Sequence, residues 1–161
     1  IYSRQRRRVM LLFKCMDVMK IPCLLKLLNI NHSVVCSGEG ENQDINKIIC
    51  WAGNMEEMVE YLTDDTLIIT PNCSAVLLAA SLAFINGVKI GGILITDEGK
   101  LSSGVANFCT RSMSDEKLPV LFCNSGYEDV CIKLKLLSVH EDSENYFVIQ
   151  NSSTCTHTEN H

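Results

Sequence analysis

The chain has 161 residues, which is the size of one ordinary domain. With 47% hydrophobic and 20% charged residues, its composition is that of a globular protein and excludes a disordered or collagen-like chain. The net charge of -5 excludes a general attraction to phosphate backbones and anionic lipid, and 6% aromatic residues leave few platforms for stacking bases. We therefore expect neither nucleic acid nor a membrane surface as a partner.

The nine cysteines include no C-x-x-C pair, and most of them lie within apolar runs. This usage is typical of small buried hydrophobic side chains in a reducing compartment. The four histidines are scattered along the chain and do not supply the spacing of a zinc site. We therefore expect no metal site and no cofactor, and a location in the cytoplasm, with an organelle as the alternative.

Residues 1–30 are predicted to be a helical segment that either packs on the following domain or belongs to a preceding one. Val9–Met19 and Pro22–Leu28 have helical patterns, and proline suits the first turn of a helix. No window reaches the ~18 uninterrupted apolar residues of a membrane span. The apolar surface of these two segments predicts self-association, and hence a homo-oligomer that deletion of residues 1–28 would loosen without unfolding the domain.

Residues 31–150 are predicted to form one α/β domain, because short apolar runs alternate there with helical patterns. The predicted strands are Ser33–Cys36, Lys47–Trp51, Thr66–Thr70, Gly92–Thr96 and Val120–Cys123. The last three contain continuous apolar runs, which are typical of parallel strands buried on both faces. The fold class is therefore a three-layer α/β domain with a mostly parallel sheet and helices on both faces.

The predicted helices lie between these strands and after them. One begins near Asn54, which has capping-box spacing to Glu57. The others are Cys73–Ile85 with a left-handed stop at Asn86–Gly87, a helix from Ser102 or Ser103 to about Ser112, Tyr127–Leu137, and a short helix from Ser143. Residues 151–161 are expected to be a disordered tail.

Known phosphate-binding motifs are incomplete in this sequence. Gly38–Gly40 begins a dinucleotide fingerprint, but Gln43 stands where the third glycine belongs and a strand pattern follows. Gly99–Lys100 is followed by Leu101, whereas a P-loop needs Ser or Thr there to hold magnesium. The adjacent acids Asp97–Glu98 are more typical of a solvated loop than of a catalytic pair. We find no catalytic candidate and expect that this chain is not an enzyme.

Ligands of parallel α/β sheets bind beyond the carboxyl ends of the strands. The loops that follow the central strands are therefore the candidate ligand-binding regions. They are residues 38–44, 71–74, 97–101 and 124–126.

Four stretches of sequence have the order and pattern of a known family. They are VVCSGEGENQDINKIICWAGNMEEMVEYL, LIITP, LLAASLAFINGVKIGGILIT and LPVLFCNSGYEDV, of which residues 77–96 are the most specific. Through them, residues 33–142 resemble the DRTGG domain. That domain occurs between the dethiobiotin-synthetase-like and catalytic regions of long phosphate acetyltransferases, and within some pyrophosphatases.

The two signatures that name the family are altered here. The family carries Gly-Asp-Arg where this chain has Asn72-Cys73-Ser74, and its Thr-Gly-Gly is replaced by Thr96-Asp97-Glu98. The resemblance implies ligand-loop roles for Pro71, Thr96 and Asn124. Their loop neighbours Asn72, Asp97 and Ser125 complete the candidate ligand-binding set. Glycines let an anion approach the backbone N–H groups closely, and an arginine adds charge-assisted hydrogen bonds. Because this chain lacks the family's glycines and arginine at these positions, we predict weak or no binding of phosphate-bearing ligands.

The resemblance implies a non-catalytic regulatory or oligomerisation module of a protein similar to phosphate acetyltransferase, which interconverts acetyl-CoA and acetyl phosphate. Catalysis would then belong to a separate C-terminal region. Two alternatives stay open: a stand-alone sensor of a small-molecule effector such as an adenine nucleotide, and a degenerate scaffold that pairs with protein partners through a helix face. A ligand-dependent shift in melting temperature separates these alternatives.

Overall fold

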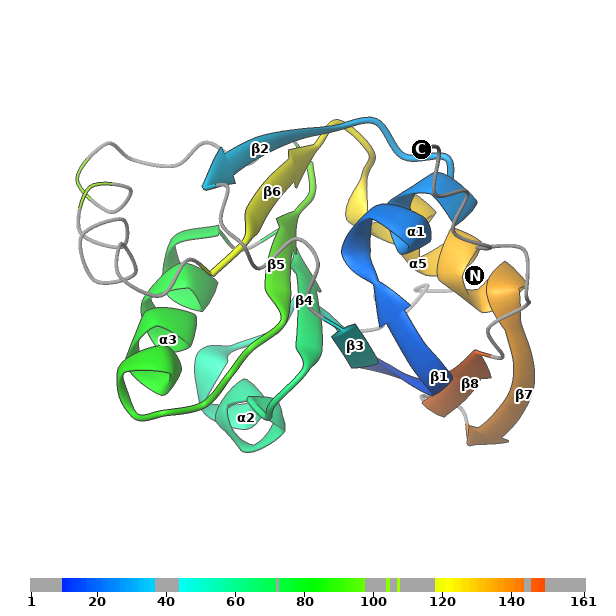
Figure 1. The fold of residues 1–161 in the computed structure, drawn as a ribbon, viewed down its shortest axis with the longest axis horizontal. Coiled ribbons are helices and arrows are strands. Elements are labelled where there is room, and N and C mark those ends of the chain that lie inside the picture. The colour runs from blue at the N-terminus through cyan, green and yellow to red at the C-terminus, as the bar shows by residue number, and fades with distance from the viewer. Residues whose placement is uncertain are drawn as a thin grey trace, which may run out of the picture.

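The structure is a computed structural model that describes residues 10–36, 44–71, 73–97, 118–143 and 146–149, together with Gly104 and Asn107. Within these residues eight strands form one mixed sheet with the order β2-β6-β5-β4-β3-β1-β8-β7 (Figure 1). The strands are β1 Met10–Lys20, β2 His32–Cys36, β3 Asp44–Trp51, β4 Thr66–Thr70, β5 Gly92–Ile95, β6 Val120–Cys123, β7 Ser138–Ser143 and β8 Tyr146–Ile149.

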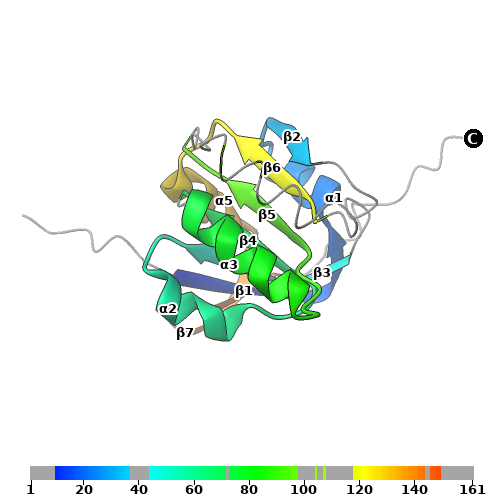
Figure 2. The ribbon, with the colours of Figure 1, turned by 90° about the vertical axis from the view of Figure 1, so that its left-hand side faces the viewer.

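Helices cover both faces of the sheet. They are α1 Ile21–Leu27, α2 Met55–Met58 with the 3-10 turn η2 Val59–Tyr61, α3 Cys73–Ile85 and α5 Tyr127–Leu137. α2 and α3 lie on one face, and α1 and α5 lie on the other (Figures 1 and 2). The predicted three-layer α/β fold is confirmed. None of the helices in the described ranges is long and apolar enough to cross a membrane.

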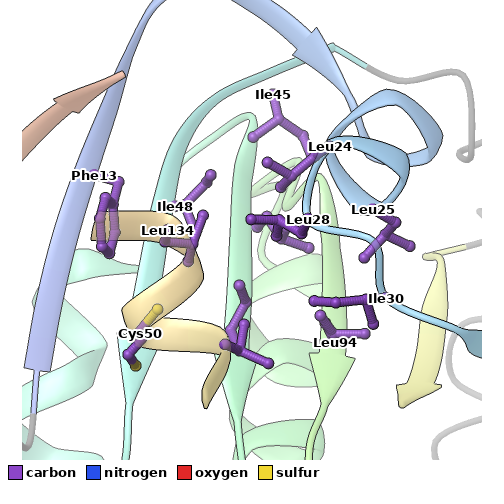
Figure 3. Close-up of a cluster of buried hydrophobic side chains, with 14 of the residues drawn as sticks. Phe13, Leu24, Leu25, Leu28, Ile30, Ile45, Ile48, Cys50, Leu94 and Leu134 are labelled. Atoms are coloured by element: carbon purple, nitrogen blue, oxygen red, sulfur yellow. The ribbon is translucent and has the colours of Figure 1, made fainter. Parts of the chain in front are cut away.

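The parallel strands β3, β4, β5 and β6 form the centre of the sheet. Every residue of β4 and β5 is buried, which is the reason for their continuous apolar runs. Successive side chains of β3 enter opposite cores: Ile48 and Cys50 pack with α1 and α5, whereas Ile49 and Trp51 pack with α2 and α3. Figure 3 draws part of the first core, including Cys50 and Ile48.

The predicted helix ends on the second face are confirmed. The side-chain Oδ1 of Asn54 accepts a hydrogen bond of 3.3 Å from the backbone N–H of Glu57 at the start of α2. α3 ends where Gly87 takes a φ of 88°, and the Val88 N–H then donates to the carbonyl of Ala83 at 3.0 Å.

Two predictions at the ends of the chain are wrong. Residues 10–20 form strand β1 and not the predicted helix, because Leu11, Phe13 and Cys15 alternate into the core with period two and the segment pairs with β3 and β8. The predicted short helix from Ser143 is also wrong: Ser143 ends β7, and Tyr146–Ile149 form β8, which pairs antiparallel with β7.

The second N-terminal helix is confirmed as α1, with Pro22 in its first turn. Its apolar side chains Ile21, Leu24 and Leu25 are buried under the sheet, so they do not supply the exposed surface expected to drive self-association. α1 lies so close to β5 that a Cβ added at Gly92 would lie 2.6 Å from Ile21 Cδ1. A larger residue at this position would therefore force the end of the Ile21 side chain to move.

Three predicted segments lie outside the described residues: the loop at residues 38–43, the helix from Ser102 or Ser103 to Ser112 apart from Gly104 and Asn107, and the tail at residues 151–161.

Candidate functional site

The candidate residues lie at the carboxyl ends of β4, β5 and β6, which parallel pairing brings to one edge of the sheet. Thr70 ends β4 and is followed by Pro71, Thr96 and Asp97 follow β5, and Asn124 and Ser125 follow β6. The backbone N–H of Thr96 donates to the Thr70 carbonyl at 3.0 Å. Both threonines are fully buried, whereas Asn124 is exposed and Pro71 and Ser125 are half-buried. Asn72 lies outside the described residues.

Asp97 forms hydrogen bonds that connect the loops after β5 and β6. Its backbone N–H donates to the Ser125 carbonyl at 3.1 Å, and its carboxylate accepts a hydrogen bond of 3.0 Å from the Thr96 hydroxyl. Its φ is 60°, in the left-handed region that glycine adopts freely. The structure thus brings Thr96, Asp97 and Ser125 together.

The carboxylate of Asp97 also reaches the first turn of α5. The two oxygens lie 3.3 and 3.2 Å from the backbone nitrogen of Tyr127, which donates to them. Gly126 is the N-cap residue of α5 and has no side chain to cap the helix. Asp97 supplies the missing acceptor from a different loop.

This arrangement determines the charge at the helix end. A helix N-terminus attracts anions, because its first N–H groups lack partners and the helix dipole is positive there. In α5 a carboxylate of the chain itself already occupies that position, and Glu128 and Asp129 add two acids to the first turn. A Cβ added at Gly126 would lie 3.3 Å from Asp97 Oδ1 and 3.6 Å from Asp129 Oδ2. The edge therefore disfavours a further anion.

Cys123, at the end of β6, places a thiol beside this edge. Burial raises the pKa of its thiol, and the negative charge of Asp97 acts in the same direction. Its Sγ lies 3.7 Å from the Ser125 carbonyl, to which it donates. A thiol whose pKa is raised stays protonated at neutral pH and is a weak nucleophile.

Further buried thiols lie beside α5. Burial raises the pKa of Cys50 well above its usual value, and a hydrogen bond from Cys50 lowers the pKa of Cys131 against the opposing effect of burial. The hydroxyl of Tyr127 is buried, has no hydrogen-bond partner within the described part of the chain, and has a pKa raised by burial. The prediction that cysteines act as buried apolar side chains is confirmed for Cys15, Cys50, Cys123 and Cys131, all of them free thiols.

One group of this site was not found from the sequence, the backbone N–H of Tyr127. Gly126 lies in the candidate loop 124–126, but the missing side-chain cap of α5 was not predicted. A glycine directly before a predicted helix leaves that helix without a local side-chain cap, which indicates that the cap comes from elsewhere. The described residues contain no group of three or more His, Cys, Asp or Glu side chains that could hold a metal ion.

The structure is thus an α/β domain in which the Asp97 carboxylate caps α5 at the carboxyl edge of the parallel strands. Residues 27–130 match the DRTGG domain, and the chain belongs to this family.

The chain is similar to phosphate acetyltransferases over part of their length. It is 34% identical to that of Pseudomonas putida over 110 residues, which is 68% of this chain and 16% of the relative. It is 36% identical to that of Haemophilus influenzae over 93 residues, which is 57% of this chain and 13% of the relative. The chain therefore spans about one sixth or less of these curated relatives. No solved structure matches it significantly.

Proposed function

We propose that this chain is a non-catalytic regulatory or oligomerisation module of a phosphate acetyltransferase-like protein. The observation that carries the proposal is the Asp97 carboxylate on the N–H of Tyr127, at the edge where parallel α/β sheets bind their ligands. The similarity to one stretch of the phosphate acetyltransferases supports the same view, because that stretch is a small part of each relative.

The chemistry of the edge argues against catalysis within it. The Asp97 carboxylate is engaged by Thr96 and Tyr127, and Thr70 and Thr96 are fully buried. The raised pKa of Cys123 keeps its thiol protonated. Acyl or phosphoryl transfer also needs donors that stabilise the developing charge, and the Thr96 hydroxyl and the Tyr127 N–H at this edge already donate to Asp97.

The catalytic part of the proposal is tested by assaying acetyl phosphate formation from acetyl-CoA and inorganic phosphate. We expect no activity above a boiled control. Activity that a point substitution such as Asp97→Ala abolishes would show that the chain itself is catalytic.

The Asp97 contact also favours one of the alternative functions, the degenerate scaffold, over the adenine-nucleotide sensor. A sensor with a micromolar site would be stabilised by ~4 kcal/mol at a thousandfold excess of ligand over its dissociation constant. We expect ATP and AMP at about 1 millimolar to leave the melting temperature unchanged. We expect Asp97→Gly to move the chain toward nucleotide binding, because it removes the competing carboxylate and restores the glycine of the family signature. A shift of several degrees in the unsubstituted chain would instead establish a nucleotide sensor.

A further inference from the structure

The outward face of α3 carries a stripe of apolar side chains. Leu78, Leu82 and Ile85 are 40%, 61% and 64% exposed, and Ala75 is also exposed. Their spacing of three, four and three residues places them in one row along the helix. Figure 2 shows α3 lying across the front of this face of the sheet, beside α2.

The core does not account for this stripe. The inward side of α3 already fills the second core through Val76, Leu77 and Ala80, each of which is buried. A surface helix of a globular domain ordinarily carries charged or polar residues on its outer side. The outer side of α3 is apolar and thus has the character of an interface.

The composition of α3 indicates what covers the stripe. The thirteen residues CSAVLLAASLAFI include no Asp, Glu, Lys or Arg. A contact between two different proteins commonly gains specificity from complementary charges, and α3 offers none. When two identical helices pair about a two-fold axis, a charged residue near that axis lies beside the same charge of the other copy, and the two repel. A helix without charged residues avoids this repulsion and therefore suits self-pairing.

The spacing of the stripe is the same in both directions along the helix. When two copies of α3 run antiparallel about a two-fold axis, Leu78 of each lies opposite Leu82 of the other. Ala75 then lies opposite Ile85, so that the smallest side chain of the stripe meets a large one. The antiparallel arrangement also sets the positive end of each helix dipole beside the negative end of the other.

We propose that the stripe formed by Ala75, Leu78, Leu82 and Ile85 is the contact through which two copies of this chain pair their α3 helices antiparallel. The proposal rests on the oligomerisation role given above. It places the contact on α3, whereas the sequence pattern predicted it on residues 9–28, in which Met16 and Val18 of β1 are exposed.

The size of the contact determines its strength. A thirteen-residue helix is ~20 Å long, and a seam one helix wide covers much less than the ~800 Å² per partner of a standard interface. The dimer is therefore weak and reversible, with a dissociation constant on the order of 100 micromolar.

Sedimentation of the 161-residue chain over a range of about 5 to 500 micromolar tests the contact. We expect Leu82→Glu to weaken the dimer at least tenfold, because two carboxylates would enter an apolar seam. The matched control is Leu136→Glu, which changes an equally apolar side chain, 81% exposed on α5, and should leave the dissociation constant unchanged.

The antiparallel register has its own test. Leu82→Glu and Leu78→Lys should each be monomeric alone, while an equimolar mixture forms a heterodimer, since residue 82 of one copy faces residue 78 of the other. Far-UV circular dichroism of each variant verifies that the fold is kept, and Leu78→Lys replaces Leu82→Glu as the test if the latter unfolds.

A chain that self-associates equally well with Leu82→Glu would overturn the α3 contact and leave the oligomerisation role intact. A folded mixture that stays monomeric would overturn the antiparallel register. A wild-type chain that is monomeric over the whole range would overturn both the contact and the oligomerisation role.

Discussion

Asp97 affects the stability of the fold in two opposing ways, and substitutions at this position can separate them. The carboxylate caps α5 through the N–H of Tyr127, which stabilises the fold. The backbone of Asp97, at a φ of 60°, lies in the left-handed region, which costs a residue with a Cβ about 1 kcal/mol. Aspartate and asparagine tolerate this region better than alanine does, and glycine adopts it freely.

The magnitudes follow from these two effects. Asp97→Ala loses the cap, at about 1 kcal/mol, and also raises the backbone cost by about 0.5–1 kcal/mol, because alanine tolerates the left-handed region less well than aspartate. We therefore expect a loss of about 1.5–2 kcal/mol of unfolding free energy. Asp97→Gly loses the cap and relieves the backbone, which leaves a loss of about 0.5–1 kcal/mol. Asp97→Asn keeps an oxygen acceptor and gives up only the charge at the helix N-terminus, a loss of about 0.5 kcal/mol.

The assay is urea unfolding of the four proteins at neutral pH, supported by thermal melts. The expected order of stability is aspartate, asparagine, glycine and then alanine. A loss of 1 kcal/mol corresponds to a fall of about 2–4 °C in a domain of this size. If Asp97→Ala is as stable as the wild type, or Asp97→Gly is no more stable than Asp97→Ala, the reasoning about the cap or the backbone is refuted.

Three further predictions concern the packing and titration of the core. Deleting residues 1–28 removes β1 from between β3 and β8, so we expect the domain itself to unfold and not only the oligomer to loosen. Circular dichroism should then show no cooperative unfolding transition, and a deletion variant that stays folded would contradict this. Burial raises the pKa of Cys15 from 9.0 to about 11. As the pH rises, the thiol of the unfolded chain therefore loses its proton before that of the folded chain, and the unfolding free energy falls between pH 9 and 11. For this group the fall amounts to at most about 2.7 kcal/mol. Urea titrations under reducing conditions should show a shallower fall in Cys15→Ala, and an equal fall would contradict the assignment. Gly92→Ala should cost about 0.5–1.5 kcal/mol, because its Cβ forces the end of the Ile21 side chain out of its present rotamer. In a double-mutant cycle, Ile21→Val, which removes Cδ1, should recover part of the loss, and additive effects would refute the clash.

The centre of the fold could be predicted because its strands are buried on both faces. A continuous apolar run such as residues 67–69 would be unfavourable on the surface, so its burial could be predicted. The end of α3 at Gly87 could be predicted because it depends only on the local backbone conformation. β1 could not be recognised in the same way. Its exposed positions include Met16 and Val18, which blur the period-two alternation, and its strand form depends on pairing with two segments distant in sequence.

The sequence predicted which edge of the sheet carries the candidate site, but it did not predict the hydrogen bonds within that site. Parallel pairing places the residues after β5 and β6 near one another, so Asp97 and Ser125 were candidates on topology alone. The hydrogen bond from Tyr127 to Asp97 joins residues thirty positions apart. Asp97 is exposed, as its place in a solvated loop predicted, but the sequence did not indicate that its carboxylate binds the start of α5. The physical reason for this contact is the uncapped helix start at Gly126, which needs an acceptor from outside its own segment.

The segment that matches the family is smaller than the sheet that supports the site. The match at residues 27–130 ends within the first turns of α5, and β1, β7 and β8 lie outside it. The inner face of α5 nevertheless packs on those strands: Leu134 shares a core with Phe13 of β1 and Phe147 of β8, whose rings stack at 5.0 Å. Because α5 is held in place from outside the family segment, the Tyr127 N–H that binds Asp97 is positioned by the whole sheet. The placement of α5 therefore depends on strands of the eight-stranded sheet that lie outside the DRTGG segment.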